Sequence, residues 1–248
     1  MFKIIVTFLV AGLLSFCTPR AHAQDSSLYI DQIGSNNTLA ITQSGVGNQI
    51  TGVGSNTSPI RGDLNSVTIR QGSNNNQLSL SLQGTGSNTL NLNQGTDASG
   101  NIVDDTGYHT QTISVSGYSN QVTTQQSGSV GHYLEANIVG NYNTVGIVQS
   151  DGTTQKQTVT NISGNNNVLN ASQTGLGNHY LDVSLNGNGN SATVNQSGNT
   201  ANTASISITN AGGPGSVNLT QTGGQNYYIN TVCVQAGGCQ PITVKQGN

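Results

Sequence analysis

The sequence predicts an all-β fold, a two-sided β-solenoid of about nine stacked strand-turn-strand coils with the cross-β stacking of amyloid. Three observations predict it. A seven-residue template recurs along the chain, apolar and polar residues alternate within it, and glycine and asparagine separate its copies. Alternation with a period of two is typical of β-strands, and a short repeat that cannot bury a face alone is stabilised by stacking on its neighbours.

The template is Asn, any residue, an aliphatic residue or Thr, any residue, an aliphatic residue or Thr, any residue, Gln. Its seven full copies and one degenerate copy place the amides that we expect to form structural ladders at Asn37, Gln43, Asn65, Gln71, Asn88, Gln94, Asn120, Gln126, Asn143, Gln149, Asn167, Gln173, Asn190, Gln196 and Gln221. The Asn, the apolar positions and the Gln share one parity and so face one side. An unpaired inward amide costs about 1–3 kcal/mol, and stacking on its copy in the next coil removes that cost.

The spacing of the template glutamines defines the coil. From Gln126 onward they recur every 23 to 25 residues, and weaker strand-like segments such as Ile162-Ser-Gly164 lie midway between them. Each coil therefore holds two strands joined by two tight turns, whose Gly and Asn residues adopt positive φ at little cost. Longer intervals predict inserted loops near 54–63 and 95–107, and the copies over 210–248 are irregular.

The N-terminus has the pattern of a secretory signal peptide. Lys3 precedes a short apolar run, and Ala21-His22-Ala23 matches the small-x-small cleavage pattern. We therefore expect residues 1–23 to be removed and residues 24–248 to form one secreted, cell-surface solenoid domain. The apolar run is too short for a stable membrane span.

The expected mature chain carries few charges. Charged residues make up 6% of the whole chain, and the four basic residues after position 23, set against nine acids, give a formal charge of −5. Without a basic stripe, nucleic acid is not an expected partner. Few carboxylates, histidines or lysines are present to cluster, so we expect no enzyme activity, no catalytic residue, no metal and no cofactor. A polysaccharide-cleaving β-helix would need charged side chains on adjacent coils, so the scarcity of charge disfavours this kind of enzyme.

Cysteine and histidine are the reactive side chains of the expected mature chain, residues 24–248. Cys233 and Cys239 are its only cysteines, and in an oxidising compartment such a pair favours a disulfide that staples a turn over a free or redox pair. A cap that limits polymerisation at that end is an alternative role. His109, His132 and His179 lie on different coils, where isolated surface histidines are favoured over a stack or a pH sensor.

Two short motifs fall in the expected loops. Arg61-Gly62-Asp63 spells an integrin-binding tripeptide, but a solvated loop is the favoured interpretation of a three-residue match. Asp97, Asp104 and Asp105 share the second insertion, where a solvated acidic loop is favoured over a site for a hard cation.

The template and its turn resemble the repeat of the curlins, the major and minor subunits of curli fimbriae, over about residues 28–246. Asn at the first position is more similar to the minor, nucleating curlin. The resemblance implies export through an outer-membrane secretion machinery and templated assembly, with itself and other curlin-type subunits, into amyloid fibres that support adhesion and biofilm. The chain departs from typical curlins in its number of repeats, its insertions, its cysteines and its short segment before the first repeat.

Two functions are carried forward from the sequence. The first is a fibre-forming or nucleating subunit of curli-like extracellular amyloid. The alternative is a non-polymerising secreted β-solenoid that binds ice or polysaccharide through outward rows such as Thr38 and Thr42. The outward residues vary between repeats, as at Thr68 and Arg70, which disfavours a regular ice-matching lattice.

Overall fold

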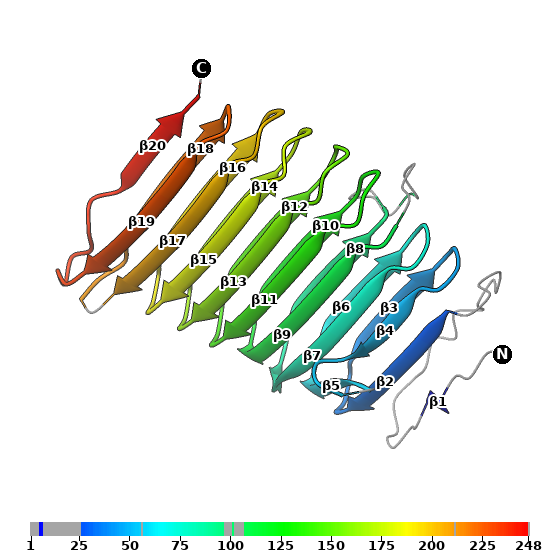
Figure 1. The fold of residues 1–248 in the computed structure, drawn as a ribbon. Helices are drawn as coiled ribbons and strands as arrows, with labels where there is room; N and C mark the ends of the chain where they lie inside the picture. The colour runs from blue at the N-terminus through cyan, green and yellow to red at the C-terminus, as the bar shows by residue number, and fades with distance from the viewer. Residues whose placement is uncertain are drawn as a thin grey trace.

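The computed structural model describes residues 5–6, 26–55, 57–96, 101, 107–210 and 212–247. These residues form twenty β-strands and no helix, and the predicted all-β solenoid of about nine coils is confirmed. The strands form two sheets, in each of which neighbouring strands run parallel. The coils are stacked along one axis (Figure 1). None of the described segments is a helix long and apolar enough to span a membrane.

The two sheets hold eleven and nine strands. Sheet A contains, in spatial order, β1 Ile5–Val6, β2 Ser27–Ile33, β4 Gln49–Gly52 with β5 Ser58–Asp63, β7 Gln77–Gly86, β9 Thr110–Tyr118, β11 Tyr133–Val139, β13 Gln157–Ser163, β15 Tyr180–Asn186, β17 Thr203–Asn210 and β19 Asn226–Cys233. Sheet B contains β3 Thr38–Gln43, β6 Ser66–Gln71, β8 Thr89–Gln94, β10 Gln121–Gln126, β12 Thr144–Gln149, β14 Val168–Gln173, β16 Ser191–Ser197, β18 Ser216–Thr222 and β20 Ile242–Gln246.

Neighbouring coils pair residue for residue. In sheet B, Gln126 lies opposite Gln149, which lies opposite Gln173. In sheet A, Ile138 pairs with Ile162 in the same way. Since paired strands are about 4.8 Å apart, each side chain meets its repeat equivalent directly above and below.

The apolar positions of both sheets form one continuous core. In β12 the burial alternates along the strand, and Val145, Ile147 and Gln149 point inward as the template parity predicts. Leu134 and Ile138 of β11 lie fully buried in the other sheet. Burying each such aliphatic side chain contributes about 1.5–3 kcal/mol, offset by the entropy of ordering the chain.

Two kinds of turn connect the sheets. The first arch leads from each sheet A strand to the following sheet B strand and contains Asn37 or its copy. The second arch leads back and begins after Gln43 or its copy. In the first arch, Gly117, Gly140 and Gly164 have φ of 127°, 127° and 125°. A Cβ on any of them would collide with a backbone carbonyl of the next coil, so only glycine fits there.

The loop expected near 54–63 is shorter than predicted. Residues 58–63 form β5, which pairs with β2 on one side and β7 on the other. β4 and β5 thus occupy one strand position that an insertion interrupts. The prediction was wrong at its C-terminal part because Ser58 and Ile60 alternate inward and are buried, and the Ser58 hydroxyl donates to the Leu80 carbonyl at 2.9 Å.

The other expected boundaries are only partly covered. Within the expected signal peptide the structure describes only β1, which pairs in parallel with β2. Most of the second insertion, including Asp97, Asp104 and Asp105, lies outside the described residues. In the C-terminal region, β18, β19 and β20 continue the stack in register.

Candidate functional site

The glutamine ladder runs through all nine strands of sheet B. Each Gln Nε2 donates to Oε1 of the next Gln, as from Gln126 to Gln149 at 2.8 Å and from Gln149 to Gln173 at 2.9 Å. The chain of bonds runs through Gln43, Gln71, Gln94, Gln126, Gln149, Gln173, Gln196, Gln221 and Gln246 without interruption. The ladder therefore continues one coil beyond the last predicted member, Gln221.

The same amides tie the two sheets together. The Nε2 of Gln149 also donates to the Tyr133 carbonyl at 3.0 Å, and that of Gln173 donates to the Gln157 carbonyl at 3.1 Å. Both acceptors belong to sheet A. Each buried Gln thus donates to the next Gln along the stack and to a carbonyl of sheet A. These bonds explain why a polar residue occupies the interior without a large cost in free energy.

The asparagine ladder follows the first arch. The Oδ1 of Asn143 accepts the backbone N–H of Asn167 at 2.9 Å, and its Nδ2 donates to the Gly164 carbonyl at 2.9 Å. Asn120 and Asn143 are joined in the same way, and the ladder covers Asn37, Asn65, Asn88, Asn120, Asn143, Asn167 and Asn190 before it ends on the N–H of Gly215. Gly215 carries no side-chain acceptor, so this ladder stops short of the last coil.

One member of the asparagine ladder is incompletely satisfied. The Nδ2 of Asn65 is buried without a hydrogen-bond partner. The register of β7 shifts between Gln83 and Gly86, where β7 carries one residue more than β9. The Gly84 carbonyl still lies against Gly62, as the Gly164 carbonyl lies against Gly140.

A third column, in the second arch, was not predicted from the sequence. Its members each directly precede a sheet A strand and are almost fully buried, and they are Asn48, Asn76, His109, His132, Lys156, His179 and Asn202. The Asn48 Oδ1 accepts the N–H of Asn76 at 2.9 Å, and the Asn76 Oδ1 accepts that of His109 at 3.1 Å. The shared position directly before a strand was the signal that could have revealed this column. The residue type changes from coil to coil, and this change hides the column in the sequence.

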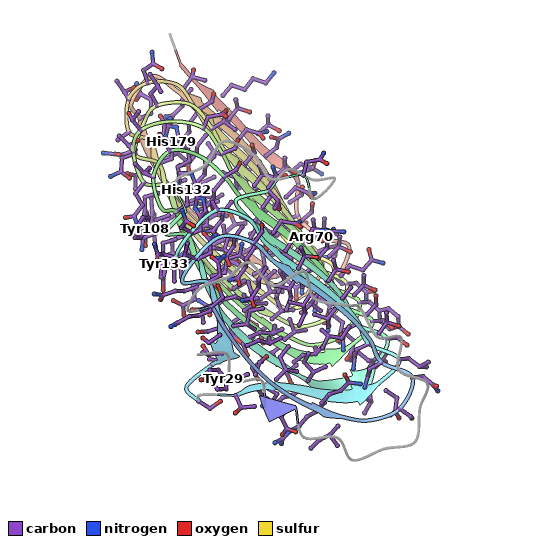
Figure 2. The ribbon with its side chains drawn as sticks, turned by 90° about the vertical axis from the view of Figure 1, so that its right-hand side faces the viewer. Tyr29, Arg70, Tyr108, His132, Tyr133 and His179 are labelled. Atoms are coloured by element: carbon purple, nitrogen blue, oxygen red, sulfur yellow. A yellow bond between two sulfur atoms is a disulfide. The ribbon has the colours of Figure 1, made fainter. Side chains whose placement is uncertain are left out.

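The histidines belong to this column, so the expectation of isolated surface side chains was wrong. His109, His132 and His179 are at most 1% exposed. The His132 Nδ1 accepts the N–H of Lys156 at 3.2 Å, and the rings of His109 and His132 lie 5.1 Å apart. Figure 2 shows His132 and His179 along the same edge of the stack. They are buried because an imidazole, like a carboxamide, offers one donor and one acceptor.

Lys156 is the one cation of the column. Its Nζ donates to the carbonyls of Asp151 at 2.6 Å and Gly175 at 2.8 Å. Burial lowers its pKa to about 8, and the charge of Asp151 opposes the shift. Because lysine carries no acceptor, it offers nothing to the N–H of His179 in the next coil.

Cys233 and Cys239 are joined by a disulfide across the last connection from sheet A to sheet B. Their Cα atoms lie 5.6 Å apart. The bonded segment packs on the preceding coil, where the N–H of Cys239 donates to the Pro214 carbonyl at 3.0 Å. In the last coil, the disulfide therefore lies in the connection that carries the asparagine ladder in the preceding coils.

Arg61, Gly62 and Asp63 end β5, and do not occupy the expected solvated loop. The Asp63 Oδ1 accepts from the Ser35 N–H at 2.6 Å and from the Ser35 hydroxyl at 2.9 Å. The Ser35 N–H holds the pKa of Asp63 below its usual value. The carboxylate is thus engaged in a contact between coils.

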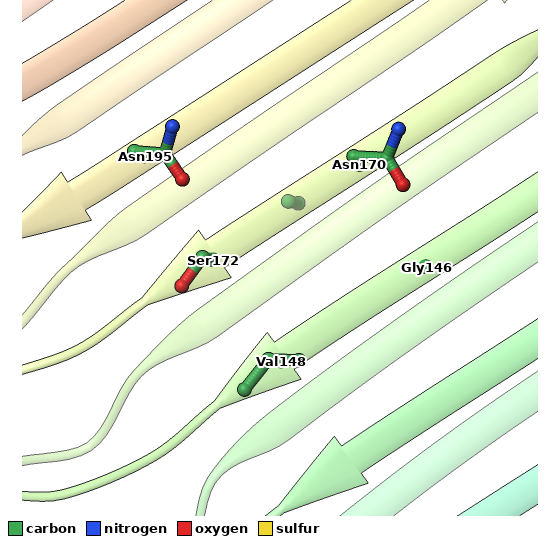
Figure 3. A pocket seen from close by; sticks show the side chains of 6 residues that line it. Gly146, Val148, Asn170, Ser172 and Asn195 are labelled. Carbon is green, nitrogen blue, oxygen red and sulfur yellow. The ribbon is translucent and has the colours of Figure 1, made fainter.

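The outer surface offers little chemistry for a small ligand. A shallow depression lies over β12, β14 and β16, where Gly146 lacks a side chain beside Asn170 and Asn195 (Figure 3). Among the described residues, no group of three His, Cys, Asp or Glu side chains could hold a metal ion. Comparison with protein-family models, curated proteins and solved structures finds no match for this chain.

Proposed function

We propose that this chain is a secreted structural subunit, fibre-forming or nucleating, of curli-like extracellular amyloid that supports adhesion and the biofilm matrix. The observation that carries the proposal is the unbroken glutamine ladder with an open member at each end. Gln43 and Gln246 occupy the outermost strands of sheet B, β3 and β20. Unprotected edges of self-similar strands favour addition of further copies.

The two ends of the stack are in compatible register. Following the strand pairs through sheet A, Tyr29 of β2 holds the same outward position as Tyr228 of β19. In sheet B, Leu39 corresponds to Ile242. A second copy placed on the C-terminal end would therefore stack tyrosine on tyrosine, aliphatic on aliphatic and Gln43 on Gln246.

Signal-peptide cleavage fits this scheme. β1 covers the outer edge of β2, and it lies within the segment that we expect to be removed. Removal of residues 1–23 would expose the β2 edge to a second copy. Export through an outer-membrane secretion machinery and co-assembly with other curlin-type subunits belong to the same proposal.

The test follows thioflavin T fluorescence of the purified chain from Gln24 onward after dilution from denaturant, with electron microscopy of the product. We expect dye-positive fibres that seed fresh monomer. A persistently soluble β-rich monomer would overturn the proposal and favour the binding module for ice or polysaccharide.

A matched pair of variants tests the end-to-end contact. Val244→Lys puts a charge on the inward face of the terminal strand β20, and Thr243→Lys puts the same charge on its outward face. We expect Val244→Lys to slow fibre growth at least tenfold and Thr243→Lys to leave it close to wild type. Equal growth of the two variants would contradict stacking on this edge.

A further inference from the structure

Three histidines of the second arch accept backbone hydrogen bonds from the next coil. The Nδ1 atoms of His109, His132 and His179 accept backbone N–H groups from His132, Lys156 and Asn202, at 3.0, 3.2 and 3.2 Å. A backbone N–H is only a donor, so each Nδ1 must carry a lone pair. The ring proton then sits on Nε2, which faces the Ser127 carbonyl in His132 and the Thr174 carbonyl in His179. The His179 ring, whose pKa is also lowered, is therefore neutral in the folded chain.

Protonation would turn each of these acceptors into a donor that faces another donor. Bringing one proton to Nδ1 both removes a hydrogen bond and leaves a buried backbone N–H without a partner. It also places a positive charge in a column already occupied by Lys156, which lies one coil from His132 and one coil from His179. Burial lowers the pKa of His179, the hydrogen bond to the Thr174 carbonyl opposes this shift, and the charge of Lys156 lowers the pKa further.

The described surroundings of His179 offer little negative charge to stabilise an imidazolium. Asp151 faces Lys156, and its charge opposes the lowering of the Lys156 pKa by burial. Glu135 accepts from the Tyr133 hydroxyl at 2.8 Å on the outward side of β11, and Asp182 lies on the outward side of β15. On the opposite sheet, the strand ends that close this arch contribute neutral glutamines, Gln94, Gln126, Gln149 and Gln173.

We propose that His179 forms an acid-sensitive latch that holds the second arch closed at neutral pH and releases it as the pH falls. The unfolded chain, with His179 near its ordinary pKa of about 6.5, binds a proton that the folded arch excludes. The stability that the latch contributes is therefore complete above about pH 6.5 and is lost progressively below it. The latch acts within one chain, so it does not depend on whether the chain polymerises.

The test compares amide hydrogen exchange in the two arches of the full chain at pH 5 and pH 7.5, corrected for intrinsic exchange rates. Exchange is quenched and read by NMR in dimethyl sulfoxide, which serves monomer and fibre alike. The amide of Asn202, which donates to the His179 Nδ1, reports on the latch, and those of Asn143 and Asn167, which donate to asparagine, are the internal control. We expect protection of Asn202 to fall at least tenfold at pH 5, with protection of Asn143 and Asn167 unchanged.

The variant His179→Asn keeps a donor and an acceptor at this position but cannot titrate. We expect it to retain protection of Asn202 at both pH values. Equal protection of wild type at the two pH values, or the same acid-induced loss in the variant, would overturn the latch. Should the variant not fold, the comparison within the wild-type chain still decides, together with the titration of the histidine ring protons.

Discussion

The two arches solve the same problem with different residues. Both must satisfy buried backbone N–H groups that point from one coil to the next. The first arch does so with asparagine in seven successive coils, as at Asn143 and Asn167. The second arch uses asparagine, histidine and lysine at equivalent positions, as at Asn76, His132 and Lys156. The first arch is therefore uniform and indifferent to pH, whereas the second carries groups that titrate.

The two arches also differ in how constant their length is. In the first arch, the same number of residues leads from Gly140 to Asn143 and from Gly164 to Asn167. In the second arch, the loop between the sheets varies in length, and asparagine, histidine or lysine holds the position before the strand. The arch of constant length keeps one residue type, while the arch of variable length accepts three.

The largest expected effect comes from crowding the first arch. Gly164→Ala would drive a methyl group into the Gly187 carbonyl at a φ of 125°. We expect the free energy of unfolding to fall by about 3 kcal/mol, measured by urea denaturation of the soluble chain. Gly146→Ala is the control, since a Cβ there meets only the flexible Asn170 side chain at 3.2 Å. A loss of similar size in the control would contradict the steric argument.

Removing one rung of the asparagine ladder is expected to have the next largest effect. Asn143→Ala deprives the buried Asn167 N–H of its acceptor and the Gly164 carbonyl of its donor. We expect a loss of about 2–3 kcal/mol in the same denaturation experiment. The exposed Asn170→Ala, one coil along, should change the stability by less than about 0.5 kcal/mol. If the two losses are equal, the ladder contributes nothing specific.

Lys156→Asn should stabilise the second arch. The substitution removes a buried cation and gives the His179 N–H an acceptor, so we expect a gain of about 1 kcal/mol at pH 7. The pKa of Lys156 is about 8 in the folded chain and ordinarily 10.5, so the unfolded state binds the extra proton between these values. Wild-type stability therefore rises as the pH increases through this window, and the advantage of the variant shrinks. Denaturation at pH 7 and pH 10 checks this, and an unchanged difference contradicts it.

The smallest effect is expected from exchanging one histidine of the second arch for asparagine. At pH 7.5, His132→Asn should change the free energy of unfolding by less than about 1 kcal/mol, because asparagine holds this position in other coils. Urea midpoints of the two chains give the comparison. A loss of unfolding free energy as large as that of Asn143→Ala would mean that the second arch tolerates substitution no better than the first.

Much of this architecture follows from alternation, which the sequence displays directly. The inward parity of Asn143, Ile147 and Gln149 can be predicted because identical residues recur at fixed spacing. The second-arch column could not be predicted, because asparagine, histidine and lysine hold its positions, and a position shared by different residue types leaves no repeat in the sequence. β5 was missed because the long interval between Gln43 and Gln71 indicated an inserted loop, although the neighbouring strands supply its pairing.

The residue-for-residue register makes the coil a unit of length. If residues 144–167 were lost together, Asn143 would be followed directly by Val168, and every column would remain continuous. Loss of one residue within a strand would instead turn each following side chain in that strand from the core to the solvent. The gene can thus grow or shrink by whole repeats without a change in the design of the fold, and duplication of a single coil is sufficient to lengthen the molecule.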